Sequence, residues 1–313
     1  MQSIDVSIII VNWNVRDILR DCLRSIYDHT KSINFEIIVI DNASSDNSCE
    51  MVAKEFPQVF LIANKENRGF AAANNQGLKV ATGKYVLLLN PDTIVPEDTI
   101  SKSFKYSENH TDVAVLGCQV WLNENEIQKT CFSFPTLTSV FLLKSGLRRL
   151  FPKSRLLGWI DYGWWDRTTL MEVDVVSGMY MFVRQKAIKD VGVMDEDYFV
   201  FAEETDWCFR FCKAGWKCIF VPLGRIIHLD GGSKSTDLIK IEMFVQHQKS
   251  ILLFIKKNRG VLSFHIVKLI FIFSMVMRLS FSLITGCWDK SGKSERKQLQ
   301  SIASLKYLVF KRR

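Results

Sequence analysis

The sequence has no pair of C-x-x-C motifs, although it contains eight cysteines in 313 residues. The most closely spaced cysteines, Cys208, Cys212 and Cys218, have no second half that would complete a structural zinc site. We therefore expect free thiols in a reducing compartment. The N-terminal segment also lacks a basic n-region before its short apolar run, so we expect no cleaved signal peptide.

An uninterrupted apolar run long enough to span a membrane is also missing. Residues 261–288 form the most apolar stretch, but Lys268 and Arg278 leave only nine uncharged residues between them, where a helical span needs about 20. An amphipathic helix or helix pair lying in the membrane interface fits this stretch better. The alternative is a buried helix that packs on the protein or in a homodimer.

Several basic residues lie near this stretch and favour contact with an anionic leaflet. They are Lys290, Lys293, Arg296, Lys297, Lys311, Arg312 and Arg313. The segment 141–159 is similarly basic and aromatic, which suits lipid contact, the wall of an acceptor groove or a solvated loop. We expect peripheral contact with the cytoplasmic face of the cell membrane.

The formal net charge of +8 and the pI near 9.0 indicate an anionic partner. The basic residues gather beside apolar stretches instead of forming a stripe with exposed aromatic platforms, which argues against nucleic acid. Phosphorylated substrates and anionic lipids remain. With 48% hydrophobic and 24% charged residues, and without repeats or low-complexity segments, the composition is typical of one large or two smaller globular domains.

The first hundred residues alternate between short β-rich runs and helical stretches. The predicted strands are 6–11, 35–42, 59–64 and 84–90, and the predicted helices are 16–30, 47–56 and 70–81. Continuous runs of Ile, Val and Leu are typical of strands covered on both faces. This βαβαβαβ pattern predicts a mostly parallel sheet with right-handed crossovers.

Polar side chains follow each of the four predicted strands. They are Asn12 and Asn14, then Asp41 and Asn42, then Asn64 to Gly69, and finally Asn90 and Asp92. Ligands of open α/β sheets bind beyond the carboxyl ends of the strands, so we expect these groups to share one rim and to face one crevice.

Two of these segments have the chemistry of a ligand site. In "IDNASSDNS" (40–48), Asp46 or Ser45 is explained as a helix N-cap, whereas Asp41 belongs to the strand end and is left as a ligand contact. In "NKENRGFAAANNQG" (64–77), the guanidinium of Arg68 beside a helix N-terminus suits a diphosphate.

A second group of candidates consists of acids and one histidine. Asp92 follows the fourth strand, Glu203, Glu204 and Asp206 follow an aromatic run, and His228 follows a later β-like run. Oxygen and imidazole ligands suit Mg²⁺ or Mn²⁺. The acidic helix start at Glu203 also has an ordinary explanation in the helix dipole.

The ordered motifs "VSIIIVNWN", "IVIDNASSD", "NRGFAAANNQG", "LLLNPDT", "VSGMYMFVR", "FAEETDWCFR" and "IIHLDGGS" together resemble the inverting glycosyltransferases of family 2. The likeness spans roughly residues 4–235 and is greatest to the rhamnosyltransferase-like branch that builds bacterial cell-surface polysaccharides. It implies an α/β protein with the GT-A fold, in which a Rossmann-like, mostly parallel central sheet is flanked by helices. A helical extension follows at the C-terminus.

The resemblance also implies roles for individual residues. Asp41 would contact the nucleotide base, Asn12, Asp46 and Arg68 would help to hold the nucleotide, Asp92 and His228 would bind Mg²⁺ or Mn²⁺, and Gly178 would lie in the acceptor-side loop. Glu204 stands at the position of the catalytic base, and its neighbour Glu203 is assigned to the substrate site.

The sequence departs from the family pattern at two of these positions. Asn90 replaces the first acid of the DxD motif, and Glu204 replaces an Asp in an acidic pair that more often reads Glu-Asp. Asp206 therefore stays an alternative base.

We predict three regions: 1–110 for the nucleotide sugar, 111–235 for acceptor binding and catalysis, and 236–313 as an amphipathic, basic helical region. The predicted function is transfer of a sugar from a nucleotide-diphosphate donor to a lipid-linked saccharide acceptor with inversion. The alternative is a degenerate nucleotide-binding or scaffold protein of a membrane-associated assembly complex.

Overall fold

A computed structural model describes residues 3–229, 240–286 and 293–310 of the chain. The chain divides into two compact units. Unit 1 comprises Met1–Phe134, Trp165–Phe199 and Glu203–Asp237, and unit 2 comprises Pro135–Trp164, Val200–Ala202 and Leu238–Arg313. All the predicted site residues lie in unit 1. Asp230 to Ser233 of the last motif, and the basic residues Lys290 and Lys311 to Arg313, lie outside the described residues.

Unit 1 contains the sheet and most of the short helices. Its strands are β1 (Val6–Asn12), β2 (Phe35–Asp41), β3 (Phe60–Ala63), β4 (Tyr85–Leu89), β5 (Thr93–Ile94), β6 (Val113–Asn123), β7 (Glu126–Ile127), β8 (Cys131–Phe132), β9 (Met171–Glu172), β10 (Val175–Val176), β11 (Tyr180–Arg184) and β12 (Lys217–His228). Its helices are α1 (Arg16–His29), α2 (Ser48–Glu55), α3 (Phe70–Val80), α4 (Thr99–Asn109), α7 (Gln185–Val191) and α8 (Glu203–Lys213). The four predicted strands and three predicted helices of the first ninety residues are thus confirmed to within one or two residues.

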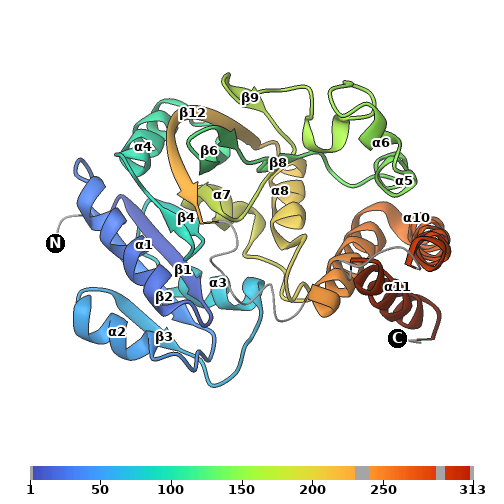
Figure 1. Cartoon of the computed structure of the whole chain (residues 1–313). Coiled ribbons are helices and arrows are strands. Elements are labelled where there is room, and N and C mark those ends of the chain that lie inside the picture. The colour runs from blue at the N-terminus through green and yellow to red at the C-terminus, as the bar shows by residue number, and fades with distance from the viewer. Residues whose placement is uncertain (1–2, 230–239, 287–292, 311–313) are drawn as a thin grey trace. The chain divides into compact units, whose positions relative to one another are not determined.

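The large sheet has the strand order β3-β2-β1-β4-β11-β6-β12-β5. β1, β2, β3 and β4 are mutually parallel, and β6 is parallel to β12, whereas β11 runs antiparallel between β4 and β6. Helices flank this sheet (Figure 1). The fold is therefore a mixed, mostly parallel α/β sheet with flanking helices, as the sequence predicts.

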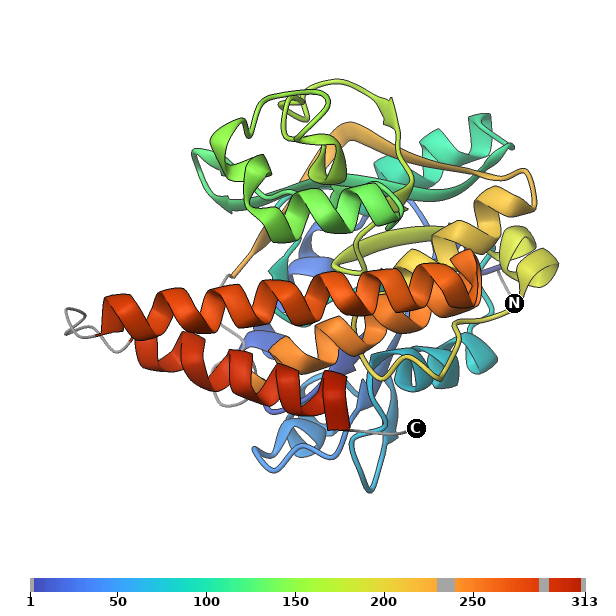
Figure 2. The same cartoon turned by 90° about the vertical axis from the view of Figure 1, so that its right-hand side faces the viewer.

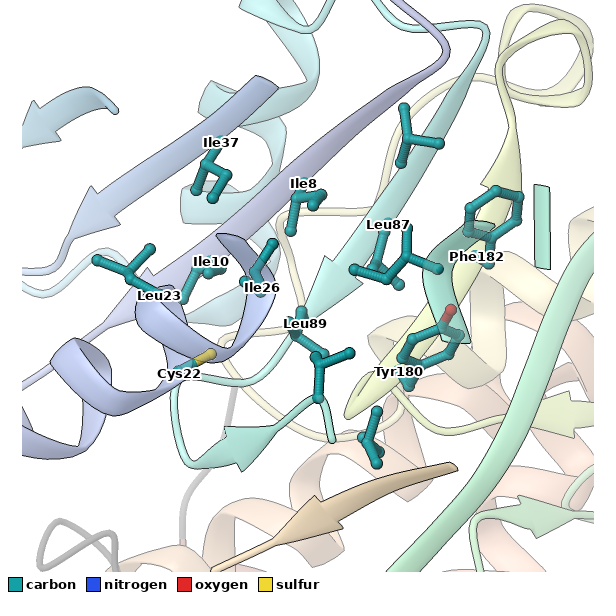
Figure 3. Close-up of a cluster of buried hydrophobic side chains, with 14 of the residues drawn as sticks. Ile8, Ile10, Cys22, Leu23, Ile26, Ile37, Leu87, Leu89, Tyr180 and Phe182 are labelled. Carbon is teal, nitrogen blue, oxygen red and sulfur yellow. The ribbon is translucent and has the colours of Figure 1, made fainter. Parts of the chain in front are cut away.

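Continuous apolar strands form the core because the sheet is covered on both faces. One cluster joins Ile8 and Ile10 of β1 and Leu87 of β4 to the buried stripe of α1, which includes Leu23 and Ile26 (Figure 3). Each fully buried side chain of this kind contributes about 1.5–3 kcal/mol relative to exposure. The core thus fixes the strand ends, and with them the rim.

Unit 2 is helical. It contains α5 (Leu137–Ser145), α6 (Leu147–Leu150), the 3₁₀ helix η1 (Trp159–Asp161), α10 (Lys240–Gly286) and α11 (Lys293–Phe310). α5 begins at a capping box between Thr136 and Ser139. The C-terminal helical extension is confirmed. Figure 2 shows α10 and α11 side by side.

α10 is two helical stretches joined at Gly260, whose φ of 86° lies outside the helical region. By length and composition alone, its Ile241–Ile284 portion is apolar enough to cross a membrane. The Gln248 side-chain nitrogen lies 3.6 Å from the Met275 sulfur, so the second stretch packs back along the first. α10 is therefore a hairpin instead of one straight rod.

Candidate active site

The carboxyl ends of the parallel strands bring the predicted polar groups to one edge of the sheet. Asn12 at the end of β1 lies opposite Asp41 at the end of β2. The Asn90 N–H after β4 donates to the Met179 carbonyl before β11 at 3.1 Å, which places the Gly178 loop at the same edge. Because β12 is parallel to β6, and β6 antiparallel to β11, His228 ends its strand there too. The predicted shared rim is confirmed.

Asp41 is buried in a tight hydrogen-bond network at this rim. Asn12 Nδ2 donates to Asp41 Oδ1 at 2.8 Å and to Ser44 Oγ at 3.1 Å, and the Ser44 N–H donates to Asp41 Oδ2 at 2.8 Å. The Asn12 Oδ1 atom is buried and has no hydrogen-bond partner in the described part of the chain. Carboxylate and amide oxygens therefore gather here as acceptors, which suits the N–H groups of a nucleotide base.

Asp46 binds the starts of two helices. Its Oδ2 atom accepts from the Arg16 N–H at 2.8 Å, and its Oδ1 atom accepts from the Ser48 N–H at 3.1 Å. Both contacts satisfy amides that a helix leaves unpaired at its N-terminus. The structure thus gives Asp46 a capping role, and its predicted contact with the nucleotide stays a prediction.

The loop that carries Arg68 is held by amide side chains. Asn42 Nδ2 donates to the Asn67 side chain and to the Gly69 carbonyl, both at 3.2 Å, and Asn42 Oδ1 accepts from Asn64 at 3.0 Å. The Arg68 side chain is exposed, and its guanidinium makes no hydrogen bond or ion pair with the described residues. A fixed loop therefore presents an unengaged cation at the start of α3.

Close approach at Gly69 joins the start of α3 to the segment that leads into α8. The Phe70 N–H donates to the Phe199 carbonyl at 2.7 Å. A Cβ at Gly69 would lie 2.3 Å from that carbonyl oxygen, and Gly69 has a φ of 81°. The Phe70 ring in turn lies 3.2 Å from where a Cβ of Gly178 would be. Glycine at these positions brings the Arg68 loop, the Gly178 loop and Phe199 together.

Gly69→Ala is expected to destabilise unit 1 strongly. The left-handed φ disfavours any Cβ, and the Phe199 carbonyl leaves no room for one, so we expect a loss of at least about 2 kcal/mol. Gly192→Ala is the matched control, because Gly192 has a φ of 84° but no atom within 4 Å of its Cβ position. Thermal melting should show the larger drop for Gly69→Ala, and equal drops would mean that the Phe199 contact adds nothing.

Asp92 and His228 face each other where β12 pairs with β5. His228 pairs with Thr93, and the His228 Nε2 atom lies 3.4 Å from Asp92 Oδ2. Both side chains are largely buried, and Asp92 Oδ1 has no partner among the described residues. The Oε1 atom of Gln128 lies 2.8 Å from His228 Nδ1. An amide oxygen can only accept, so Nδ1 of His228 carries a proton and Nε2 is the ring nitrogen that faces Asp92.

Asp92 Oδ2 and His228 Nε2 face each other in a buried place, a geometry that suits a proton on the ring or a metal ion between them. The set of one carboxylate and one imidazole suits Mg²⁺ or Mn²⁺, whose remaining ligands come from phosphate oxygens or water. The described residues contain no group of three or more His, Cys, Asp or Glu side chains that could hold a metal. Asp92 and His228 thus fit a cation that binds together with a diphosphate.

The acidic pair opens α8. Glu203 is buried, and its Oε2 atom has no hydrogen-bond partner in the described part of the chain. Burial, together with the charge of Glu204, raises the pKa of Glu203 well above its usual range, and burial also raises the pKa of Glu204. Phe201 and Ala202 precede the pair with φ angles of 69° and 65°. Left-handed backbone of this kind is costly and concentrates at functional sites.

Asp206 is occupied in a structural ion pair. Arg210 Nε donates to Asp206 Oδ2 at 2.9 Å, and the same guanidinium donates to the carbonyls of Val191 and Val193. Trp207 also donates to the Gly192 carbonyl at 2.8 Å. Asp206 is thus already paired with the guanidinium that ties α8 to Val191 and Val193, so the geometry favours Glu204 as the proton acceptor.

Sequence reasoning missed Gln128 and Phe199. Gln128 follows a two-residue strand, and no motif marks it. Phe199 acts through its carbonyl, which carries no signal in the sequence.

Part of the chain is similar in sequence to a known protein family. Residues 7–151 match the family model described as Glycosyl transferase family 2. The matched range includes Asn12, Asp41, Asp46, Arg68 and Asp92. It ends before the remaining candidates, which are Gly178, Glu203, Glu204, Asp206 and His228.

Two curated relatives are bacterial proteins. The minor teichoic acid biosynthesis protein GgaB of Bacillus subtilis is 33% identical over 125 residues, which are 38% of this chain and 14% of GgaB. The N-acetylglucosaminyl-diphospho-decaprenol L-rhamnosyltransferase of Mycobacterium tuberculosis is 22% identical over 249 residues, 70% of this chain and 74% of that protein. This chain thus spans only a small part of GgaB.

One solved structure resembles almost the whole chain. The mannosyltransferase PcManGT from Pyrobaculum calidifontis, in complex with GDP-Man and Mn²⁺, has a TM-score of 0.58 at 15% identity, covering 99% of this chain and 88% of that one. At this identity the likeness concerns the fold. Together the matches show a GT-A-like fold and a sequence likeness to family 2 glycosyltransferases over residues 7–151.

Proposed function

We propose that this chain, whose residues 7–151 match the family 2 glycosyltransferase model, is an inverting hexosyltransferase of bacterial cell-surface polysaccharide biosynthesis. Its donor is a nucleotide-diphosphate sugar, and its acceptor is a lipid-linked saccharide. The observation that carries the proposal is the buried pair of Asp92 and His228, whose facing Oδ2 and Nε2 atoms fit a cation at the rim that also holds Asp41.

The donor lies along the rim. Asp41, with the free Oδ1 atom of Asn12, accepts hydrogen bonds from the base, and the guanidinium of Arg68 pairs with the diphosphate. Asp92 and His228 would hold Mg²⁺ or Mn²⁺. When bound, such an ion neutralises the negative charge that grows on the departing diphosphate.

Glu204 acts as the general base. It accepts the proton of the acceptor hydroxyl while that oxygen attacks the anomeric carbon, and the bond from that carbon to the diphosphate breaks with its electron pair. Attack and departure on opposite faces invert the anomeric centre. Burial raises the pKa of Glu204 and so brings its affinity for a proton closer to what a base needs near neutral pH.

The Gly178 loop suits the acceptor side, because it touches Phe70 at the start of α3 and is hydrogen-bonded to Asn90 through Met179. An acceptor on a lipid carrier would place the enzyme at the cytoplasmic face of the cell membrane. Its location there is part of the proposal.

A thermal-shift panel of nucleoside diphosphates, with and without Mn²⁺ or Mg²⁺, tests the proposal. A ligand at 100 times its dissociation constant adds about 2.7 kcal/mol to the stability of the folded state, so a nucleotide that binds the protein raises its Tm. We expect one nucleotide class to stabilise the protein in a metal-dependent way, and Asp41→Asn to abolish the shift. Asp112→Asn, at an exposed ion pair with Lys217, is the control. No stabilisation by any nucleotide would contradict the proposal.

A further inference from the structure

The second stretch of α10 has a continuous apolar face. Exposed apolar side chains recur every three or four residues along it: Leu262, Ile266, Leu269, Phe273, Met277, Phe281 and Ile284. Three of them, Leu262, Phe273 and Ile284, are 76%, 68% and 72% exposed. At 1.5 Å per residue the stripe runs for about 33 Å. An exposed apolar surface of this length marks an interaction site.

The two charges that interrupt this stretch in the sequence do not lie on the apolar face. Arg278 donates to Gln300 of α11 at 2.6 Å, and its guanidinium lies over the Phe244 ring at 4.8 Å. Lys268 follows the buried Val267 and is half-buried. The apolar stripe is therefore free of charge, while its opposite face, with Phe271 and Met275, is covered by protein. A helix covered on one side in this way suits the plane of a bilayer surface.

The positive charge of the chain is concentrated in residues 240–313, which include this hairpin. Residues 240–313 carry 15 of the 41 Lys and Arg but only three of the 33 Asp and Glu, a formal charge of +12, which leaves −4 for residues 1–239. On α11, Arg296 and Lys297 are exposed. Two copies of such a surface would repel each other, whereas an anionic bilayer attracts both the charges and the apolar stripe.

We infer that the stripe from Leu262 to Ile284, with the basic residues of α11, docks on an anionic phospholipid bilayer and lies in its interface. The inference rests on the proposed function, because a lipid-linked acceptor is met at a membrane. α10 then acts as an amphipathic anchor whose apolar side chains enter the headgroup boundary. The second stretch of α10 does not cross the bilayer, because its other face packs against Gln248 of the first stretch and against α11.

The experiment measures co-sedimentation of the full chain with vesicles of phosphatidylcholine alone or mixed with phosphatidylglycerol, at low and high ionic strength. We expect binding to the anionic vesicles that weakens with salt, because exposed charges are screened. The double variant Leu269→Ser with Phe273→Ser should lose at least about tenfold in binding, because two exposed apolar side chains no longer enter the lipid. Phe60→Ser, at an exposed aromatic residue of β3 in unit 1, should bind as the wild type does.

Three results would overturn the inference. They are equal binding of the double variant, a stable dimer in light scattering that the double variant abolishes, and retention of the protein in cell membranes after an alkaline wash, which indicates a span. Thermal melting checks that each variant is folded. Vesicle binding is read separately from nucleotide binding, so loss of the first with the second intact rejects the anchor and leaves the proposed transferase standing.

Discussion

Glu204→Gln is expected to lower kcat for sugar transfer about 10²- to 10⁴-fold while leaving donor binding unchanged. Glutamine keeps the shape of the side chain but cannot accept the proton of the acceptor hydroxyl. In the proposed mechanism, donor binding depends on Asp41, Arg68 and the cation instead, so the Tm shift with nucleotide should persist. A product assay under donor saturation, paired with the nucleotide titration, separates the two effects.

Asp206→Asn is the control that distinguishes the two candidate bases. It breaks the ion pair with Arg210 and should lower the Tm, yet transfer by the folded fraction should fall far less than in Glu204→Gln. The reverse ranking, with Asp206→Asn nearly inactive and Glu204→Gln active, would move the base to Asp206. Sugar transfer by Glu203→Gln gives a second comparison, between the two acids Glu203 and Glu204.

The raised pKa values also predict how stability changes with pH. Because burial raises the pKa of Glu203 and of Glu204 in the folded state, protonation of these groups favours folding. Their contribution is fully present below the pKa of the unfolded chain, and it is lost as pH rises through the folded-state values. Glu203→Gln should therefore raise the Tm relative to the wild type more at pH 8 than at pH 4. Such a gain would mean that the buried acid lowers stability, as groups kept for activity often do.

The strand ends could be read from the sequence because two rules act together. Buried parallel strands need continuous apolar runs, and the polar residue that ends each run is then fixed at the rim. This is why Asn12, Asp41 and Asn90 were placed correctly without coordinates. The register of β1 with β2, in which Asn12 lies opposite Asp41, follows from the same pattern.

Features that depend on tertiary packing could not be read in this way. The direction of Arg278 is set by Gln300 and Phe244, which lie 22 residues after it and 34 before it in the chain. The sequence therefore predicts an amphipathic helix or helix pair here but does not show that Arg278 turns away from the apolar face. In the same way, the role of Gln128 depends on a contact with a residue 100 positions away. Hydropathy patterns report only on neighbours along the chain.

Asp92→Asn is expected to weaken Mn²⁺ binding and to lower transfer by more than about a hundredfold, because a bound cation supplies several kcal/mol of charge stabilisation in the transition state. The amide keeps the size of the side chain and removes its charge. Since Asn90 already replaces the first acid of the motif, no second carboxylate in that motif takes over. Electron paramagnetic resonance of free Mn²⁺ measures binding directly, with and without a nucleoside diphosphate.

Gln128→Leu gives the graded comparison for the same site. It removes the acceptor that holds the His228 proton on Nδ1, and partners of this kind are worth about 10- to 100-fold in metal affinity. We therefore expect Mn²⁺ binding to weaken in the order wild type, Gln128→Leu, Asp92→Asn, with Asp112→Asn unchanged. Undiminished Mn²⁺ and nucleotide binding in Asp92→Asn would mean that the buried pair of Asp92 and His228 is structural. Charge on the diphosphate would then have to be met by Arg68, and Arg68→Ala would become the variant with the larger loss.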